Sequence, residues 1–170
     1  MGLFSSSRRV RRVREGRYKL ALPDEERTLV ANLVAQLGEL LTETTDDPSV
    51  RRLFPTAYHD DPERDREYQQ LVRDELLGRR LAALATVGAT REANELDRSQ
   101  LTAWMTALND LRLVLGTRLD VSEEAVELEP DDPEAPAYAV YGYLSYLLGE
   151  VVDALADGLG DPEPEPDSPI

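Results

Sequence analysis

The sequence predicts a mainly α-helical protein, a bundle of about four long helices that follows a basic N-terminal β-hairpin. Three observations predict this fold. Apolar residues recur at spacings of three and four along four separate stretches, as they do on one face of an α-helix. Two of these stretches begin with aspartate followed by proline, at 61–62 and 132–133, which is a typical helix start. Near the N-terminus, Glu15-Gly16 separates two short segments and predicts a hairpin turn.

The length and composition suit a single globular domain. The chain has 170 residues, no cysteine and a formal net charge of −15. We place the domain at 8–157, between a disordered tip at 1–7 and a disordered acidic tail at 158–170. The lack of cysteine excludes disulfides, thiol catalysis and zinc–thiolate sites. No apolar run is long enough to span a membrane, and the N-terminus lacks the apolar core of a signal peptide, so we expect a cytoplasmic protein.

Positive charge is concentrated at the N-terminus. Residues 1–19 hold seven basic residues and one acid, a net charge of +6, so the remaining residues carry −21. The acidic remainder of the chain, the body, repels nucleic acids, so any contact with DNA has to come from residues 1–19, the basic arm. We expect such DNA binding to be weak. Two interpretations of the arm stay open. Salt bridges to the body hold it in place, or it contacts a nucleic acid or an acidic partner.

The first half of the domain contains the hairpin, two predicted helices and a loop. The hairpin runs from Arg8 to Leu22, and acids at 24–26 then suit the first turn of a helix because of its dipole. The apolar stripe of this helix consists of Val30, Leu33, Leu37 and Leu40. A loop follows, with one helical turn predicted at 48–53. The next helix spans 62–90, but its apolar stripe changes face, so we expect a break near Gly78 or different neighbours along its length.

The stretch 96–119 predicts the central helix around which the other elements pack. Its inward face is formed by Leu101, Trp104, Leu108, Leu111 and Leu115. Asp97 can act as the N-cap of this helix, and Gln100, at the third helical position, can complete a capping box with it. Gly116 is a candidate C-terminal residue near the other end of the helix.

Arg112 does not fit this pattern, because at 100° per residue it points into the apolar stripe. A charge there requires a partner, since an unpaired buried charge is costly. We expect a contact with Glu75 first and Asp74 second, on the preceding helix. With Asn109 and Asp110, Arg112 would then form a buried polar network that sets the register of two helices. A ligand pocket built on the same charges is the alternative.

The C-terminal part begins with an acidic, irregular segment at 120–130, in which 125–129 could add a short strand. A last helix then runs to about Ala156, with an apolar stripe typical of core packing. Tyr143 and Tyr146 are the candidate partner-binding residues of this helix, and the arginines Arg11, Arg12 and Arg14 of the arm are the second contact. The hairpin could equally cover these tyrosines.

The sequence offers few catalytic residues. His59 is the only histidine, so neither a Ser-His-Asp triad nor a histidine pair for a metal can be completed. No glycine-rich phosphate loop is present. The many chance carboxylate pairs are typical of a solvated acidic face. We therefore expect a protein that is not an enzyme and that holds no metal or other cofactor.

Several blocks of residues, between Arg8 and about Leu155, resemble the AosR-like actinobacterial family, long catalogued as a domain of unknown function. The residues that carry the resemblance are Arg51-Arg52-Leu53-Phe54-Pro55-x-Ala57-Tyr58, Asp60-Asp61-Pro62-Glu63, Arg73-Asp74, Leu76-Leu77, Arg80-Leu81-x-x-Leu84, Leu108-Asn109-Asp110-Leu111-Arg112-Leu113-x-Leu115-Gly116-Thr117-Arg118-Leu119 and Asp131-Asp132-Pro133-x-Ala135-Pro136. The blocks are specific in combination, and none of them is a catalytic motif.

The resemblance implies a cytoplasmic regulator of transcription under oxidative stress that contacts the transcription machinery, notably an extracytoplasmic-function sigma factor. Thiol sensing, which the family name implies, is impossible in a chain without cysteine. We therefore expect a non-enzymatic regulatory protein that binds a sigma factor or an RNA polymerase subunit. The alternatives are an adaptor or scaffold linked to Clp proteolysis, and a DNA-binding regulator that acts through its basic arm.

Overall fold

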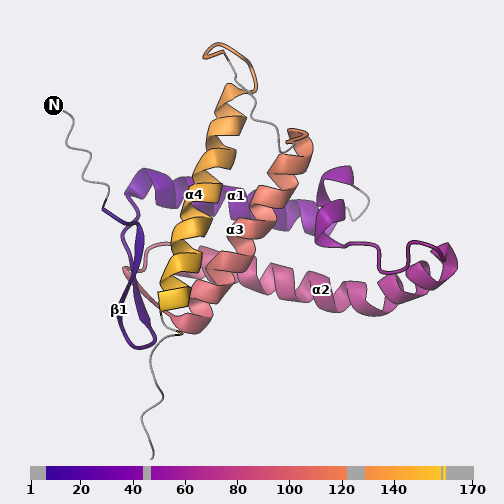
Figure 1. Cartoon of the computed structure of the whole chain (residues 1–170), viewed down its shortest axis with the longest axis horizontal. Coiled ribbons are helices and arrows are strands. Elements are labelled where there is room, and N and C mark those ends of the chain that lie inside the picture. The colour runs from indigo at the N-terminus through magenta and orange to yellow at the C-terminus, as the bar shows by residue number, and fades with distance from the viewer. Residues whose placement is uncertain (1–6, 44–46, 122–128, 158, 160–170) are drawn as a thin grey trace, which may run out of the picture.

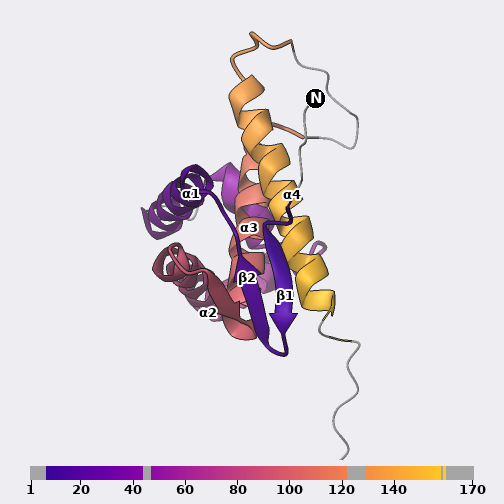
Figure 2. The same cartoon turned by 90° about the vertical axis from the view of Figure 1, so that its left-hand side faces the viewer.

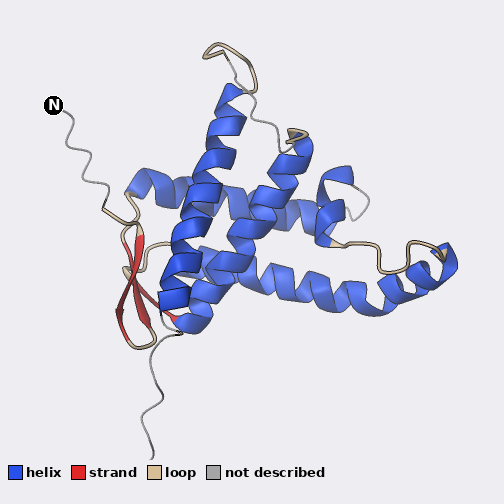
Figure 3. Ribbon diagram, viewed as in Figure 1, coloured by secondary structure: helices blue, strands red, loops and turns tan. Residues whose placement is uncertain are grey.

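The structure, a computed structural model of the chain, describes residues 7–43, 47–121, 129–157 and 159. Most of the predicted tip and acidic tail, and almost all of the strand predicted at 125–129, fall outside these residues. Among the described residues, the long helices are α1 (Asp24–Glu43), α2 (Pro62–Thr90), α3 (Arg98–Arg118) and α4 (Ala135–Asp157). The predicted hairpin is formed by β1 (Val10–Arg14) and β2 (Arg17–Leu20), and the predicted helical turn is a 3-10 helix, η1 (Pro48–Leu53). The predicted fold class is confirmed (Figure 3).

The long helices form two crossed pairs. α3 and α4 run antiparallel, side by side, and α1 and α2 form the second pair behind them (Figures 1 and 2). α3 packs against α4, α2 and η1 and also touches α1. It is therefore the central helix, as its apolar pattern predicts.

A third strand, which the sequence pattern did not reveal, completes a small antiparallel sheet. β3 (Glu95–Asp97) pairs with β2, and the strand order is β1-β2-β3. In this register Arg11 lies opposite Lys19, and Lys19 lies opposite Glu95. The hairpin turns at Gly16, whose φ of 64° lies in the left-handed region that favours glycine. β3 is only three residues long and leads directly into α3, which is why its pattern merges with that of the helix.

The predicted start of α3 is confirmed in detail. Asp97 is the N-cap and accepts a hydrogen bond from the backbone N–H of Gln100, whose side chain accepts one from the N–H of Asp97. The stop predicted at Gly116 is wrong, because α3 continues to Arg118. Gly116 instead makes room for a neighbour, since a Cβ at this position would lie 3.0 Å from Cε2 of Tyr141 on α4.

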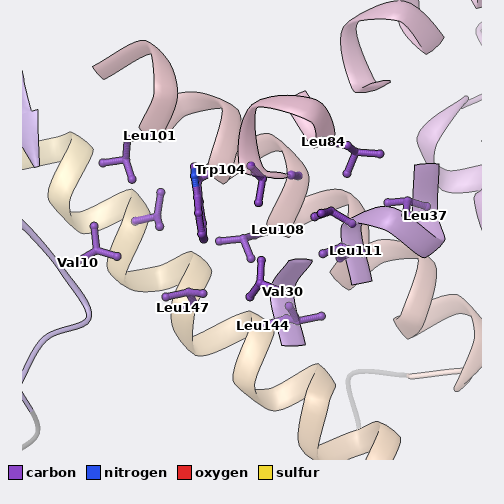
Figure 4. Close-up of a cluster of buried hydrophobic side chains, with 14 of the residues drawn as sticks. Val10, Val30, Leu37, Leu84, Leu101, Trp104, Leu108, Leu111, Leu144 and Leu147 are labelled. Carbon is purple, nitrogen blue, oxygen red and sulfur yellow. The ribbon is translucent and has the colours of Figure 1, made fainter. Parts of the chain in front are cut away.

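One hydrophobic core joins the helices to the sheet. Trp104 is fully buried in it, and its indole Nε1–H donates to Oγ1 of Thr90 at 2.8 Å. Buried side chains from the hairpin, from α1 and from α4 pack around the buried face of α3 (Figure 4). The hairpin contributes Val10, Tyr18 and Leu20 to this core. The hairpin is therefore packed as part of the domain. No helix within the described part of the chain combines the length and the apolarity needed to cross a membrane.

α2 is continuous through Gly78, and its change of face reflects a change of neighbours. The second half contributes Ala83, Leu84 and Val87 to the buried residues. The first half extends beyond the body (Figure 1), and its Leu71 is 81% exposed. The apolar stripe of α2 therefore changes face because the two halves of the helix have different neighbours, and the alternative of a break near Gly78 is wrong.

The loop that precedes α2 folds back along its projecting half. Asp65 accepts hydrogen bonds from the backbone N–H groups of Ala57 and Tyr58, at 2.8 and 3.1 Å. The ring of Tyr58 meets that of Tyr68 edge to face, with centroids 5.8 Å apart. These contacts cover one side of the projecting half and leave Leu71 in solvent.

Candidate functional site

A buried ion pair joins α2 to α3. Asp110 of α3 is only 1% exposed, and its Oδ1 accepts a hydrogen bond from Nη1 of Arg80 on α2. The same guanidinium donates through Nη2 to the backbone oxygen of Leu53 in η1, at 2.9 Å. One arginine therefore ties two long helices and η1 together.

This ion pair is incompletely satisfied. Oδ2 of Asp110 and Nε of Arg80 are buried, and neither has a hydrogen-bond partner among the described residues. Burial raises the pKa of Asp110, while the hydrogen bond and the charge of Arg80 oppose that rise. Buried polar groups without partners are uncommon in folded proteins and often mark a site that takes water or a ligand.

The predicted partners of Arg112 are wrong. Glu75 instead pairs with Arg79 on its own helix at 2.5 Å, with both side chains well exposed, and Asp74 is exposed. Arg112 is half-buried, and its Nε has no hydrogen-bond partner among the described residues. The α2–α3 ion pair that does form has the opposite polarity, because α3 carries the carboxylate and α2 the arginine. Glu75 misses α3 because it lies before the buried half of α2, where the two helices meet.

An open cavity of about 310 Å³ adjoins the Arg80–Asp110 pair. Its lining residues come from α2, α3 and α4 and are Arg80, Met105, Thr106, Asn109, Asp110, Leu148 and Val152. Asn109 and Asp110, two members of the predicted polar network, therefore lie together at a cavity, while Glu75 and Asp74 do not line it. Polar groups from two helices and apolar groups from a third can hold a small polar molecule here.

The arm lies against the acidic body. Arg9 pairs with Glu26 on α1 at 3.0 Å, and Arg14 and Arg17 both reach Glu95 on β3, at 3.6 and 3.3 Å. The interpretation of an arm held by salt bridges therefore matches the geometry.

Arg11 and Arg12, two of the predicted contact residues of the arm, differ in how far they are exposed to solvent. Arg12 is half-buried and donates from Nη1 to the backbone oxygen of Asp157 at the end of α4, at 3.2 Å. Arg11 is exposed, with Lys19 opposite it on β2. Like charges that face each other across two strands are unfavourable, although Lys19 also lies opposite Glu95 on β3.

The two predicted tyrosines lie at the junction of α4 with the hairpin. The hydroxyl of Tyr143 donates to Oε2 of Glu26 at 2.9 Å, and its ring packs against the core. Burial, together with the hydrogen bond to Glu26, raises the pKa of Tyr143 far above its usual range. Burial opposes the ionisation of Glu26, but the hydrogen bonds from Arg9 and Tyr143 outweigh it and hold the Glu26 pKa below its usual value. Tyr143 is thus a residue that holds the arm.

Tyr146 is 45% exposed, and its hydroxyl donates to Oε1 of Glu150 at 2.8 Å. The other oxygen of Glu150 accepts the backbone N–H groups of Arg9 and Val10, at 2.6 and 3.1 Å. Glu150 therefore links Tyr146 to the hairpin, although part of the Tyr146 ring stays available to a partner.

Arg27 is a buried hydrogen-bond donor that joins several segments and that the sequence pattern did not reveal. It is 6% exposed, and its guanidinium donates to four backbone oxygens and one side-chain oxygen. The acceptors and distances are Leu22 O 2.8 Å, Leu20 O 3.0 Å, Arg91 O 2.5 Å, Ala93 O 2.8 Å and Asn94 Oδ1 3.4 Å. A signal was present, because Arg27 precedes Val30 by three positions on the inward stripe of α1.

The loop around His59 shows no metal-binding geometry. Among the described residues, no group of His, Asp or Glu side chains is arranged to hold a metal ion. Asp61 acts as the N-cap of α2, where it accepts the backbone N–H of Arg64 at 3.1 Å.

Comparisons with known proteins give a family and distant relatives. A family profile described as a domain of unknown function, DUF2017, matches residues 7–155. A protein of Mycobacterium tuberculosis named oxidative stress regulator AosR is 33% identical over 119 residues, which is 59% of this chain and 55% of that protein. A protein of Mycobacterium leprae, named putative oxidative stress regulator AosR, is 31% identical over 128 residues, 65% of this chain and 59% of that protein. The matched part thus spans little more than half the length of these relatives, and no solved structure matches the chain.

Proposed function

We propose that this chain, which belongs to the DUF2017 family, is a non-enzymatic regulator of the response to oxidative stress that binds a sigma factor or an RNA polymerase subunit. The names of the mycobacterial relatives support the regulatory role. The partner class is supported by the family resemblance of the sequence blocks around the ion pair and along α2. The observation that carries the proposal is the surface of that helix.

The projecting half of α2 offers an apolar anchor for a protein partner. Leu71 is 81% exposed, and Tyr68, one turn before it, is 38% exposed. Residues three apart on a helix share a face, so the two side chains form one apolar spot. Interfaces draw most of their binding energy from such anchors when a partner's pocket covers them.

The charge of the body favours a basic partner. Outside the arm, the chain carries a net charge of −21. Asp24, Glu25 and Asp153 are among the exposed acids on α1 and α4. Sigma factors and polymerase subunits present basic surfaces to nucleic acid, and complementary fields accelerate association. The ion pairs of the arm with Glu26 and Glu95 make the DNA-binding alternative weaker, because these arginines already have carboxylate partners.

Binding to purified mycobacterial RNA polymerase, as core enzyme and with each available sigma factor, tests the proposal. We expect the wild-type chain to bind one of these proteins and Leu71→Ser to bind at least tenfold more weakly. Val152→Ser, at a residue of α4 that is 44% exposed, is the matched control and should bind normally.

The melting temperature of both variants should stay close to that of the wild type, because exposed side chains contribute little to stability. A wild-type chain that binds neither polymerase nor sigma factor would overturn the proposal. Equal binding by Leu71→Ser and wild type would show that the interface does not include the exposed apolar surface of α2.

A further inference from the structure

We infer that Met105 is the oxidation site of this chain, at which a hydroperoxide converts the thioether into a sulfoxide beside the Arg80–Asp110 pair. This inference rests on the proposed role in oxidative stress and adds a chemical input to it. It follows from the sulfur content of the chain, the position of Met105 and the groups that share its cavity.

Sulfur occurs at only two positions. The chain has no cysteine and two methionines, Met1 and Met105. Reversible oxidation of a thiol is therefore impossible. A methionine thioether also reacts reversibly, because methionine sulfoxide reductases return the sulfoxide to the thioether. Met105 is the sulfur that lies within the folded domain.

Met105 is both packed and reachable. It is half-buried on α3 and packs against the hydrophobic core. It also lines the open cavity of about 310 Å³ next to the ion pair. A molecule as small as hydrogen peroxide can enter a cavity of this size. Trp104, the preceding residue, is fully buried and thereby shielded from the same oxidant.

The cavity holds groups that respond to a sulfoxide. A thioether is a weak hydrogen-bond acceptor, whereas a sulfoxide oxygen is a strong and polar one. Arg80 lines the cavity, and its Nε is a buried donor for which the described residues offer no partner. Asn109 lines it as well and lies four residues after Met105, on the same face of α3. The new oxygen therefore appears beside hydrogen-bond donors and, as an acceptor, can compete with Asp110 for the guanidinium of Arg80.

The chemical step is balanced with the peroxide as the oxidant. The sulfur of Met105 attacks one peroxide oxygen, the O–O bond breaks, and an S–O bond forms. The sulfur loses two electrons, the attacked oxygen gives up its proton, and the other oxygen takes up a proton and leaves as water, or as an alcohol from an alkyl hydroperoxide. The product is more polar than the thioether and sits where α2, α3 and α4 meet, so it weakens their apolar contact.

Graded hydrogen peroxide treatment of the purified full-length chain tests the inference, with N-acetylmethionine in the same tube as an exposed reference. Peptide mass mapping should show one added oxygen at Met105, at a rate within about tenfold of the reference. Thermal unfolding of the oxidised chain should shift down by about 3–6 °C, consistent with 1–2 kcal/mol in a domain of this size. Methionine sulfoxide reductases A and B together should restore the original melting temperature.

Met105→Leu is the matched control, because leucine is close to methionine in volume and carries no sulfur. Its melting temperature should not respond to the same peroxide treatment. The wild-type chain measured before and after oxidation carries the test by itself if this variant folds poorly. The inference is overturned if Met105 stays unmodified while the reference is fully oxidised, or if the oxidised chain melts like the untreated one.

These outcomes are separate from those of the polymerase assay, because the oxidation assay contains no partner. Binding of a polymerase protein by a chain whose Met105 resists oxidation would remove only the present inference. Oxidation and destabilisation of a chain that binds no polymerase protein would remove only the proposed partner.

Discussion

Asp110 and Arg80 meet across the contact of α2 with α3 and leave one oxygen of the carboxylate and one N–H of the guanidinium without a partner in the described part of the chain. Losing one member of such a buried pair leaves an uncompensated charge in the interior. Arg80→Met should therefore lower the free energy of unfolding by about 3–5 kcal/mol. Arg80→Met combined with Asp110→Leu should recover most of that loss, because no buried charge remains. Urea unfolding measures both variants.

The exposed pair formed by Arg79 and Glu75 provides the control. Arg79→Met should change the free energy of unfolding by no more than about 0.5 kcal/mol, because water screens an exposed ion pair. A loss in Arg79→Met as large as that in Arg80→Met would mean that burial is not the cause.

The same pair predicts a pH dependence. Burial holds the pKa of Asp110 above its unfolded value, so the native state binds this proton more tightly than the unfolded state does. The contribution of Asp110 to stability is therefore greatest below the unfolded pKa and declines as pH rises through the folded pKa. Removing Arg80 raises the folded pKa further, since its attraction opposes the burial. The stability gap between wild type and Arg80→Met should widen from about pH 4 towards pH 7. A gap that stays constant over that range would contradict the assignment.

Glu150 holds the N-terminal end of the hairpin against α4. Glu150→Ala leaves the backbone N–H groups of Arg9 and Val10 without their acceptor. Hydrogen exchange at these two amides should accelerate by at least tenfold. Asp153→Asn, at an exposed residue one turn later on α4, should leave their exchange unchanged. Equal exchange in Glu150→Ala and wild type would show that the apolar contacts of Val10 suffice to hold the strand.

Arg27 should not tolerate a change to lysine. The planar guanidinium reaches acceptors on several sides, and an ammonium group on a flexible stem cannot satisfy them together. Arg27→Lys should lower the free energy of unfolding by about 2–4 kcal/mol, because buried carbonyl groups lose their donors. Arg66→Lys, at an exposed site on α2, should have no measurable effect in the same urea titration. Similar stabilities of the two variants would argue that water replaces the lost donors.

Two glycines in helices predict opposite effects of alanine. At Gly116 a Cβ would lie 3.0 Å from Cε2 of Tyr141, whereas no atom of the described residues lies within 4 Å of a Cβ at Gly142. Gly142→Ala should stabilise the protein by about 0.5–1 kcal/mol through helix propensity. Gly116→Ala should destabilise it by about 1 kcal/mol, because the crowding of Tyr141 outweighs that gain. Melting temperatures that rise in both variants would mean that the ring moves aside freely.

Local signals in the sequence predicted the helices well. The range predicted for α2 matches the observed helix, and the cap formed by Asp97 and Gln100 is present. These features depend on residues that are close in sequence, so a single chain displays them. β3 was missed because its pairing with β2 joins residues almost eighty positions apart, which no local pattern records.

The ion pairs were harder to predict than the helices. Helical spacing identified Arg112 as a misfit, but the rotation of one residue relative to a neighbouring helix depends on where the helices cross. Where α2 and α3 cross, the residues that face each other and form the ion pair are Arg80 and Asp110. Arg27 carried the same signal as Arg112, a charged residue on an apolar stripe, and its partners are mostly backbone oxygens, which have no sequence signature.

The carboxylate of Glu150 also affects how the chain meets other copies of itself. β1 is an edge strand, and free N–H groups on an edge invite another strand to pair with it, which is a common route to aggregation. By accepting the N–H of Val10, Glu150 occupies a donor that an incoming strand would need at the start of β1. A side chain on a helix thus gives the small sheet, at the start of β1, protection of the kind that a further strand would provide.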